Sequence, residues 1–307
     1  MSATEAGPVA GAAAAGGGAD PDQQPAHASA PRGLRARLLF ALGGLLGAAG
    51  WFLRIRRGVV EDNLARAFPA LAAAERRRIA RACYAHLGCT LAEVALARGL
   101  TDAELAAWVA FDGFEKYQRA LASGRGVVCA VAHFGNWELL GRATARRGVR
   151  LTAITRRLRG RFNLWILSVR REAGMEVLGD KGVSADVLRL LRRGEVLAVA
   201  VDQNMRPRRG IFVDFFGSPA CTTPAAAVYA QRAGAVLLMA FPVRQPDGTH
   251  LVKVLGPFEA PAGARGPAAT LALTQQLTRA VEETVRAAPE QWYWLHRRWK
   301  TRPPAAG

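Results

Sequence analysis

The chain is poor in the residues that build metal sites and disulfides. Its 307 residues include four cysteines and five histidines. No two cysteines form a CxxC pair, and no cysteine stands at metal-ligand spacing from a histidine. This pattern argues against a disulfide scaffold and fits a reduced compartment. Cys129 lies within an apolar run, where we expect a buried small hydrophobic side chain rather than a nucleophile.

Acidic residues and lysines are also scarce. The sequence holds 42 Lys+Arg against 24 Asp+Glu, a formal net charge of +18, and nearly all of the cations are arginines. GC-rich coding, which raises Arg, Ala and Gly together, is one explanation. A surface with this charge still favours anionic membranes, phosphorylated substrates or nucleic acid. Nucleic acid is disfavoured among these partners, because the arginines are dispersed and no nucleic-acid-binding motif appears.

One long apolar run without a charge is present, Leu38–Leu53. Its sixteen residues fall short of the ~20 that a membrane-spanning helix usually needs. Trp51 and Phe52 near its end, together with arginines on both sides, suit a membrane interface. A short spanning helix, an interfacial anchor and a buried core helix are all compatible with this pattern.

The region before this run is rich in Ala, Gly and Pro, and we expect a disordered tail there. It has no basic segment ahead of an apolar core, so it does not resemble a secretory signal. The sequence therefore predicts a tail over residues 1–33, a membrane-anchoring hydrophobic helix over 34–57 and one catalytic domain over 58–304.

Within the last region, two helical segments precede an alternation of strands and helices. The helical pattern runs from Val59 to about Leu100 and breaks at Pro69. The expected strands are Val127–Ala132, Leu151–Thr155, Val196–Val201 and Val236–Val243, and the expected helices lie near Trp137–Arg147, Phe162–Ala173, Pro224–Ala233 and Leu271–Ala288. This alternation predicts an α/β fold, with helices on both faces of a central sheet.

The segment Gly126–Glu138 carries the clearest chemical signal. A β-branched apolar run ends at His133, Gly135 permits a sharp turn, and Asn136 suits the N-cap of a helix that carries Glu138. A neutral imidazole at a strand end can take a proton from a hydroxyl, and a carboxylate behind it can fix its tautomer. The alternative is a strand-terminal histidine beside a glutamate that favours the helix dipole.

Several motifs in the right order resemble the lysophospholipid acyltransferase superfamily, whose signature is His, four residues, then Asp or Glu. The closer resemblance is to its branch of lipid A late acyltransferases. It is carried by Asn63–Pro69, Gly126–Glu138, Phe212–Gly217 and Trp294–Pro303. The Phe-Pro-Glu-Gly-Thr-Arg-type block of the glycerolipid members is missing, which argues against a simple glycerol-phosphate acyltransferase.

The resemblance implies a membrane-associated O-acyltransferase with a mixed central sheet like that of glycerolipid acyltransferases. Such an enzyme moves a fatty acyl group, of the lauroyl or myristoyl type, from acyl-carrier protein or acyl-CoA to a hydroxyl of a phosphorylated glycolipid. A lipid A precursor is the expected acceptor, and a phosphatidylinositol mannoside is the alternative. The implied location is the cell inner membrane, with the catalytic domain on the cytoplasmic face. Because the donor is already activated, no metal or organic cofactor is expected.

The resemblance also implies roles for individual residues. His133 and Glu138 form the expected general-base dyad, and an Arg and an Asp at comparable places in the family imply active-site roles for Arg170 and Asp202. The expected oxyanion donors are the turn amides around Gly135 and Asn136. The residues expected to bind substrate are Asn136, Arg156 and Gln203.

Two further groups of residues are open to more than one interpretation. Arg156 begins a basic cluster after a strand, which suits phosphate binding but equally a solvated face. Phe212, Phe215 and Phe216 are compatible with an acyl channel or with the core. The aromatic and basic end of the chain, Trp292–Lys300, suits a headgroup interface.

Overall fold

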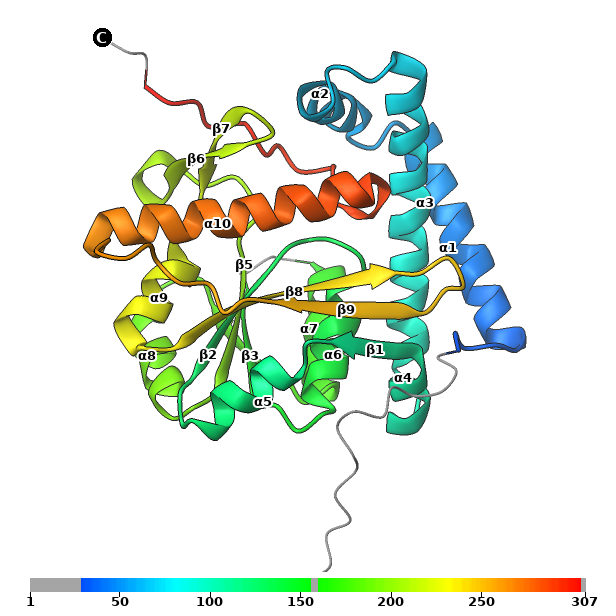
Figure 1. The fold of residues 1–307 in the computed structure, drawn as a ribbon. Helices are drawn as coiled ribbons and strands as arrows, with labels where there is room; N and C mark the ends of the chain where they lie inside the picture. The colour runs from blue at the N-terminus through cyan, green and yellow to red at the C-terminus, as the bar shows by residue number, and fades with distance from the viewer. Residues whose placement is uncertain (1–28, 156–159, 305–307) are drawn as a thin grey trace, which may run out of the picture.

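A seven-stranded mixed sheet forms the centre of the protein (Figure 1). The computed structural model describes residues 29–155 and 160–304. The strands of this sheet are β1 (Val109–Asp112), β2 (Val127–Val131), β3 (Leu151–Thr155), β4 (Glu176–Gly179), β5 (Val196–Ala200), β8 (Val236–Arg244) and β9 (His250–Leu255). Their order is β1-β9-β8-β2-β5-β3-β4. β8 and β9 are antiparallel, whereas the other neighbours are parallel, so the expected mixed α/β class is confirmed.

Helices cover both faces of the sheet, as the alternating pattern predicts. They are α4 (Asp102–Trp108), α5 (Glu115–Ala122), α6 (Trp137–Ala145), α7 (Arg161–Glu172), α8 (Ser184–Arg192), α9 (Ala225–Ala233) and α10 (Gly266–Ala287). The central strand β2 shows the two layers. Val128 and Ala130 pack into a cluster with α8, α9 and α10, while Val127 and Cys129 pack into one with α5 and α6. Buried on both faces, β2 has a continuous apolar sequence.

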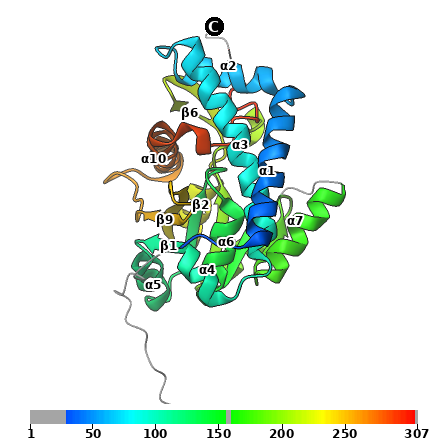
Figure 2. The same cartoon turned by 90° about the vertical axis from the view of Figure 1, so that its right-hand side faces the viewer.

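Three helices at the N-terminal end stand beside the sheet (Figures 1 and 2). They are α1 (Leu34–Phe52), α2 (Arg57–Ala67) and α3 (Ala73–Ala97). α1 packs along α3 through glycines, because a Cβ atom at Gly43 would lie 2.4 Å from the carbonyl oxygen of Gly88. The opposite side of α1 exposes a row of leucines: Leu34, Leu38, Leu42, Leu45 and Leu46. Residues 1–28 of the expected tail lie outside the described residues.

The length and composition of α1 bear on the anchoring hypothesis. Over residues 29–155 and 160–304, no single helix is long and apolar enough to cross a membrane. α1 and α2 meet that test only as a pair, and they are bent by 85° relative to each other.

Several elements have no counterpart in the sequence prediction. They include β1, β4 and β9, and a small two-stranded hairpin of β6 (Ile211–Phe215) and β7 (Ser218–Thr222) that packs on α10. The described residues also include two 3₁₀ turns, η1 (Pro207–Arg209) and η2 (Pro289–Gln291).

Candidate active site

The turn after β2 brings His133 to the carboxyl edge of the sheet. Gly135 has a φ of 56°, and a Cβ atom there would lie 1.7 Å from the carbonyl oxygen of Pro242. Only glycine fits this close approach. Asn136 then caps α6, since its side-chain oxygen accepts a hydrogen bond of 3.0 Å from the amide of Leu139. The expected strand, turn and N-cap are therefore all present.

Asp202, at the end of β5, is the carboxylate that binds the imidazole of His133. Nδ1 of His133 lies 2.8 Å from Oδ1 of Asp202, and the backbone amide of His133 donates to Oδ2 at 2.8 Å. The indole of Trp292 donates to the same Oδ2 at 2.8 Å. Because β2 and β5 are parallel neighbours, their ends place these residues together although they lie far apart in sequence.

The second ring nitrogen of His133 faces Gln203. Nε2 of Gln203 lies 3.3 Å from Nε2 of His133 and donates to it when the proton of the neutral ring is on Nδ1. This tautomer leaves a lone pair on Nε2, as a general base requires. The His133 side chain keeps 23% of its surface exposed, whereas that of Asp202 is fully buried.

The charges of this pair shift both pKa values. Burial lowers the pKa of His133, but the charge and hydrogen bond of Asp202 outweigh it, and the pKa is raised above the usual 6.5. Burial acts on Asp202 in the opposite sense, yet the neighbouring His133 holds the pKa of this carboxyl well below its usual value. Asp202 is thus ionised at neutral pH and favours a protonated His133.

Glu138 pairs with Arg170 instead of with the imidazole. Arg170, on α7, donates from Nε to Oε2 of Glu138 at 2.9 Å and from Nη2 to Oε1 at 2.6 Å, and it also donates to Thr155. The expected arrangement, with Glu138 directly behind His133, is therefore replaced by a His133–Asp202 contact and a separate Glu138–Arg170 pair. Trp137 links the two, because its indole donates to Glu138 at 3.1 Å and its ring packs against His133.

Two other expectations for the turn need correction. The amide of Gly135 donates to the carbonyl of Gln291 at 2.8 Å, so this expected oxyanion donor is already engaged within the protein. The side chain of Asn136, expected to contact substrate, is fully buried and uses both ends of its amide on Leu139 and Glu93. Asn136 therefore supports the turn from within.

The aromatic end of the chain is part of the core. Trp292 and Trp294 are fully buried and Arg298 is 1% exposed, so the expected headgroup interface is not formed by these side chains. The end instead completes the site, since the amide of Tyr293 donates to the carbonyl of His133 at 2.9 Å and Trp292 binds Asp202. Sequence reasoning missed Trp292, although an indole in a cluster of aromatics was a signal for a buried donor.

Two sequence candidates remain, Arg156 and Cys129. Arg156 falls in residues 156–159, which lie outside the described residues. Cys129 is buried, and burial raises the pKa of its thiol to about 12, so it is unsuited to act as a nucleophile.

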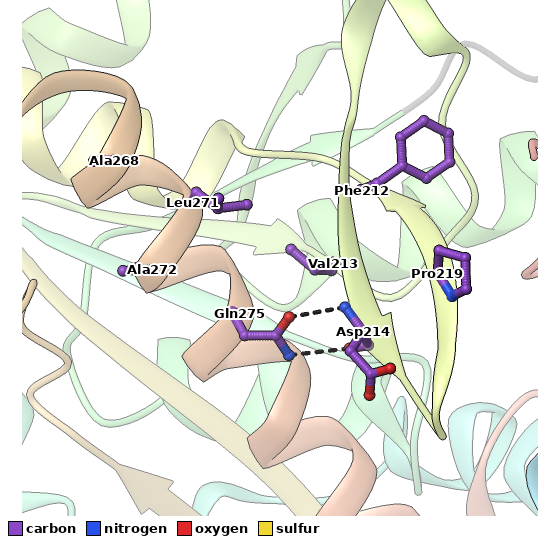
Figure 3. Close-up of a pocket in the computed structure, with 8 residues that line it drawn as sticks. All are labelled: Phe212, Val213, Asp214, Pro219, Ala268, Leu271, Ala272 and Gln275. Atoms are coloured by element: carbon purple, nitrogen blue, oxygen red, sulfur yellow. Dashed lines mark hydrogen bonds between the residues drawn. The ribbon is translucent and has the colours of Figure 1, made fainter. Parts of the chain in front are cut away.

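The phenylalanines of the 212–217 segment have two different environments. Phe215 and Phe216 belong to the core. Phe212 lines a groove of about 560 Å³ between the β6–β7 hairpin and α10, where Gln275 bonds the backbone of Asp214 (Figure 3). This groove shares no lining residue with the His133 site.

Comparison with known proteins extends over most of the chain. Residues 28–301 match the model of a family described as bacterial lipid A biosynthesis acyltransferase. The chain is 29% identical to the lipid A biosynthesis lauroyltransferase of Escherichia coli, over 87% of this chain and 86% of that protein. It is 28% identical to the palmitoleoyltransferase of lipid A biosynthesis in the same organism, with the same coverage. A phosphatidylinositol mannoside acyltransferase of Mycobacterium tuberculosis is 28% identical, over 61% of this chain and 58% of that protein.

Proposed function

The chain belongs to the bacterial lipid A biosynthesis acyltransferase family. We therefore propose that it transfers a fatty acyl group from a thioester to a hydroxyl of a phosphorylated glycolipid, and that this acceptor is a lipid A precursor. One observation carries this proposal. A buried carboxylate, Asp202, binds Nδ1 of His133, and Nε2 of the same partly exposed ring contacts Gln203 at the carboxyl edge of the sheet. α/β proteins commonly bind their ligands at this edge.

In the proposed reaction His133 acts as the general base. The acceptor hydroxyl displaces the amide of Gln203 from Nε2, and Nε2 takes its proton as the oxygen attacks the thioester carbonyl carbon. Asp202 stabilises the imidazolium that forms. Collapse of the tetrahedral intermediate breaks the C–S bond, and the imidazolium returns the proton to the leaving thiolate. The products are an ester and a free thiol, and no acyl-enzyme is formed.

Glu138 and Arg170 have a supporting part in this proposal. Their two parallel hydrogen bonds form a bidentate pair, which fixes geometry more tightly than a single contact. Glu138 holds the indole of Trp137 against the His133 ring and adds negative charge that favours the imidazolium. The N-terminus of α6, which follows the turn, favours the developing negative charge of the intermediate.

Membrane association is proposed from the surface of α1. Leu34 and Leu45 are 74% and 68% exposed, and Phe52 and Leu53 extend the apolar surface at the helix end. Exposing a row of leucines to water is unfavourable, whereas a helix at a membrane interface buries such side chains among lipid chains. We therefore propose that α1 lies on the cytoplasmic face of the inner membrane, and that acyl-carrier protein or acyl-CoA approaches from the aqueous side.

The phosphatidylinositol mannoside acyltransferase relatives support a second acceptor. The two candidates differ in their acceptor lipid, so purified enzyme should be offered a lipid A precursor and a phosphatidylinositol mannoside separately, each with lauroyl-acyl-carrier protein and with lauroyl-CoA. Mass spectrometry of the lipid products identifies the acceptor by the gain of one acyl chain.

His133→Ala tests the mechanism in the same assay. We expect it to lower turnover roughly 10²–10⁴-fold, which is the usual contribution of a positioned base. Combining His133→Ala with Glu138→Gln should cost little more than the worse single change, because residues that act as a unit are non-additive. Near-normal turnover by folded His133→Ala, or an acyl group trapped on Cys129, would overturn the mechanism.

A further inference from the structure

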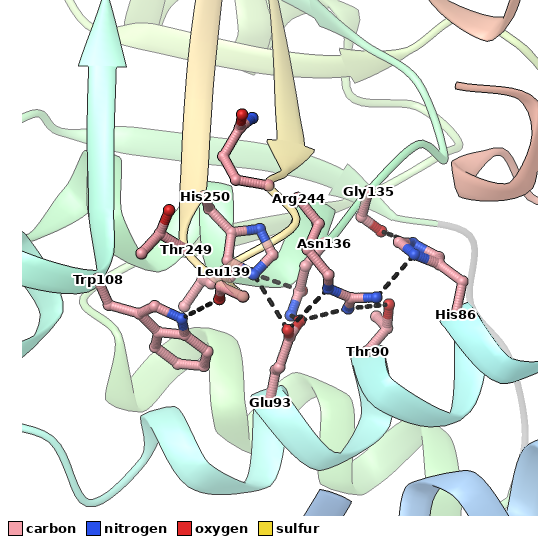
Figure 4. A network of polar contacts seen from close by, with 12 residues as sticks. His86, Thr90, Glu93, Trp108, Gly135, Asn136, Leu139, Arg244, Thr249 and His250 are labelled. Atoms are coloured by element: carbon pink, nitrogen blue, oxygen red, sulfur yellow. Dashed lines mark hydrogen bonds and ion pairs between the residues drawn. The ribbon is translucent and has the colours of Figure 1, made fainter. Parts of the chain in front are cut away.

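A buried polar network contacts the turn that follows β2, at Gly135 and Asn136 (Figure 4). Its centre is Glu93, whose side chain is 1% exposed. Oε1 of Glu93 accepts from Nε of Arg244 at 2.9 Å and lies 3.1 Å from Nε2 of His250. Oε2 accepts from Nη2 of Arg244 at 2.6 Å and from Nδ2 of Asn136 at 2.9 Å. These four contacts use the full acceptor capacity of a carboxylate.

The network draws on three separate parts of the fold. His86, Thr90 and Glu93 lie on one face of α3, at the i, i+4 and i+7 spacing of a helix. Arg244 ends β8 and His250 begins β9, so the β8–β9 hairpin supplies the guanidinium and an imidazole, and α3 supplies the carboxylate. Nη1 of Arg244 also lies 2.7 Å from Nδ1 of His86.

Each of the two central turn residues is held by this network. Nε2 of His86 lies 3.3 Å from the carbonyl oxygen of Gly135. Since Arg244 can only donate to Nδ1 of His86, the ring carries its proton on Nε2 and donates it to Gly135. Glu93 holds the amide of Asn136 so that the opposite oxygen caps α6 at Leu139. The turn residues between His133 and Glu138 are thus fixed from behind.

Stability alone gives little reason for such a cluster. Taking charges out of water is unfavourable, and replacing a buried ion pair by apolar residues is often neutral or stabilising. What a fully bonded network supplies is one defined geometry. Here that geometry is imposed on the only two residues that separate Phe134 from Trp137.

We propose that Glu93 is a positioning residue of the acyl transfer reaction, which it serves by fixing Gly135 and Asn136 through Arg244, His86 and its own bond to Asn136. The proposal rests on the proposed function for its catalytic part. Its structural part, that Glu93 makes the turn rigid, can be tested whether or not the protein is an acyltransferase. A misplacement of about 1 Å in a catalytic group can lower turnover by about 10²-fold, so a loosened turn is expected to affect kcat strongly.

The first variant is Glu93→Gln, which keeps the side-chain shape but leaves Arg244 charged and unpaired. We expect kcat to fall about 10–100-fold, with the KM values for lauroyl-acyl-carrier protein and for the lipid A precursor changed by less than about 3-fold. Amide hydrogen exchange at residues 133–140 should accelerate at least about tenfold. The stability of the protein should also fall, because a lone buried cation is unfavourable.

The second variant separates positioning from stability. Combining Glu93→Gln with Arg244→Gln removes the lone charge, so we expect stability to recover while kcat and the exchange rate at the turn do not. If Glu93 had only a structural role, the double variant would recover stability, kcat and the wild-type exchange rate together. That result would overturn the proposal. If neither variant folds, His86→Gln decides, since it removes the imidazole contacts to Gly135 and Arg244 but leaves Glu93 paired with Arg244. Unchanged exchange at the turn in His86→Gln would equally overturn the proposal.

Glu282→Gln is the matched control. Glu282 also accepts from an arginine, Arg286, and from a backbone amide, that of Phe216, but it lies on α10 away from the turn. The Glu282→Gln variant should therefore keep the wild-type kcat and the wild-type rate of amide exchange at residues 133–140. If the wild-type protein transfers no acyl group to either acceptor, the proposed function fails, and the exchange measurements still decide whether Glu93 fixes the turn.

Discussion

At the scale of single residues, His133 is surrounded by groups that act on its charge in opposite directions. Burial and Arg170 favour the neutral ring, while Asp202 and Glu138 favour the imidazolium, and the net effect raises the pKa above 6.5. A base must be neutral to accept a proton. The value of kcat/KM in the wild-type enzyme should therefore fall as pH drops through a pKa above 6.5.

Asp202→Asn makes this expectation specific. Without the carboxylate, burial dominates, so the pKa of His133 falls and the acid limb of the kcat/KM profile moves to lower pH. Turnover should also drop by roughly 10²–10⁴-fold, because the imidazolium loses its stabilising charge. The measurement is a pH–rate profile from pH 5 to 9. Asp214→Asn, which changes an exposed carboxyl on β6, serves as the control and should keep the wild-type profile. An unshifted acid limb in Asp202→Asn would contradict the assignment.

At the scale of elements, α1 presents different chemistry on its two sides, and each side supports a prediction. The exposed side is tested by changing Leu38, Leu42 and Leu45 to Gln together. These side chains are 61%, 51% and 68% exposed, so the fold should tolerate the change. Binding to vesicles that contain anionic lipid should weaken strongly, because α1 then lacks most of the apolar surface that is proposed to contact the lipid chains.

Co-sedimentation with such vesicles measures this effect. Changing Leu271 to Gln, an exposed leucine on α10, provides the control and should leave vesicle binding as in the wild-type protein. Unaltered binding by the triple variant would place the membrane contact elsewhere.

The buried side of α1 is tested by Gly88→Ala on α3. A Cβ atom at Gly88 would lie 1.9 Å from the carbonyl oxygen of Gly43, so α1 must move away from α3. We expect a loss of about 1–3 kcal/mol, the usual cost of overpacking a tight contact. Thermal or urea unfolding measures it. Gly44→Ala on the open side of α1 has no atom within 4 Å and should instead stabilise by about 0.5–1 kcal/mol. Equal effects of the two changes would mean that the helices are not in close contact.

The elements that the sequence predicted are those with strong local patterns. The expected strand Leu151–Thr155 has the bounds of β3, and the expected N-cap Asn136 begins α6. The β6–β7 hairpin was missed because its turn has positive φ at Phe216 as well as Gly217, whereas such turns are usually recognised by Asn-Gly or Asp-Gly.

The site was only partly predictable for a different reason. A pattern along the chain reports neighbours in sequence, so it joined His133 to Glu138. The partner of the imidazole is fixed instead by strand order, which makes β5 a neighbour of β2 and brings Asp202 beside His133. Local periodicity does not report the order of strands in a sheet.

At the scale of the whole molecule, buried histidines make stability depend on pH. Burial, with the nearby Arg244, lowers the pKa of His86 to about 3, and burial lowers that of His296 to about 4. In the unfolded chain both titrate near 6.5, so between pH 6.5 and 4 the unfolded state binds more protons. Stability therefore falls as pH falls through this window, by at most roughly 1.4 kcal/mol per pH unit for each histidine.

Urea unfolding at pH 7, 6 and 5 checks this dependence. His86→Gln removes one of the two groups, so its stability should decline less steeply than that of the wild-type protein over the same range. A wild-type stability that is flat between pH 6.5 and 5 would contradict the expected linkage.

The contacts that hold the turn after β2 also set the moment at which the candidate site is complete during synthesis of the chain. Gln291, Trp292 and Tyr293 bind Gly135, Asp202 and His133, yet they lie more than 150 positions after the turn. At a translation rate of about 5–20 residues per second, these partners are synthesised roughly eight to thirty seconds after the turn. A nascent chain from which residues 291–293 have not yet emerged therefore holds an unfinished site, and acyl transfer requires that these residues have left the ribosome.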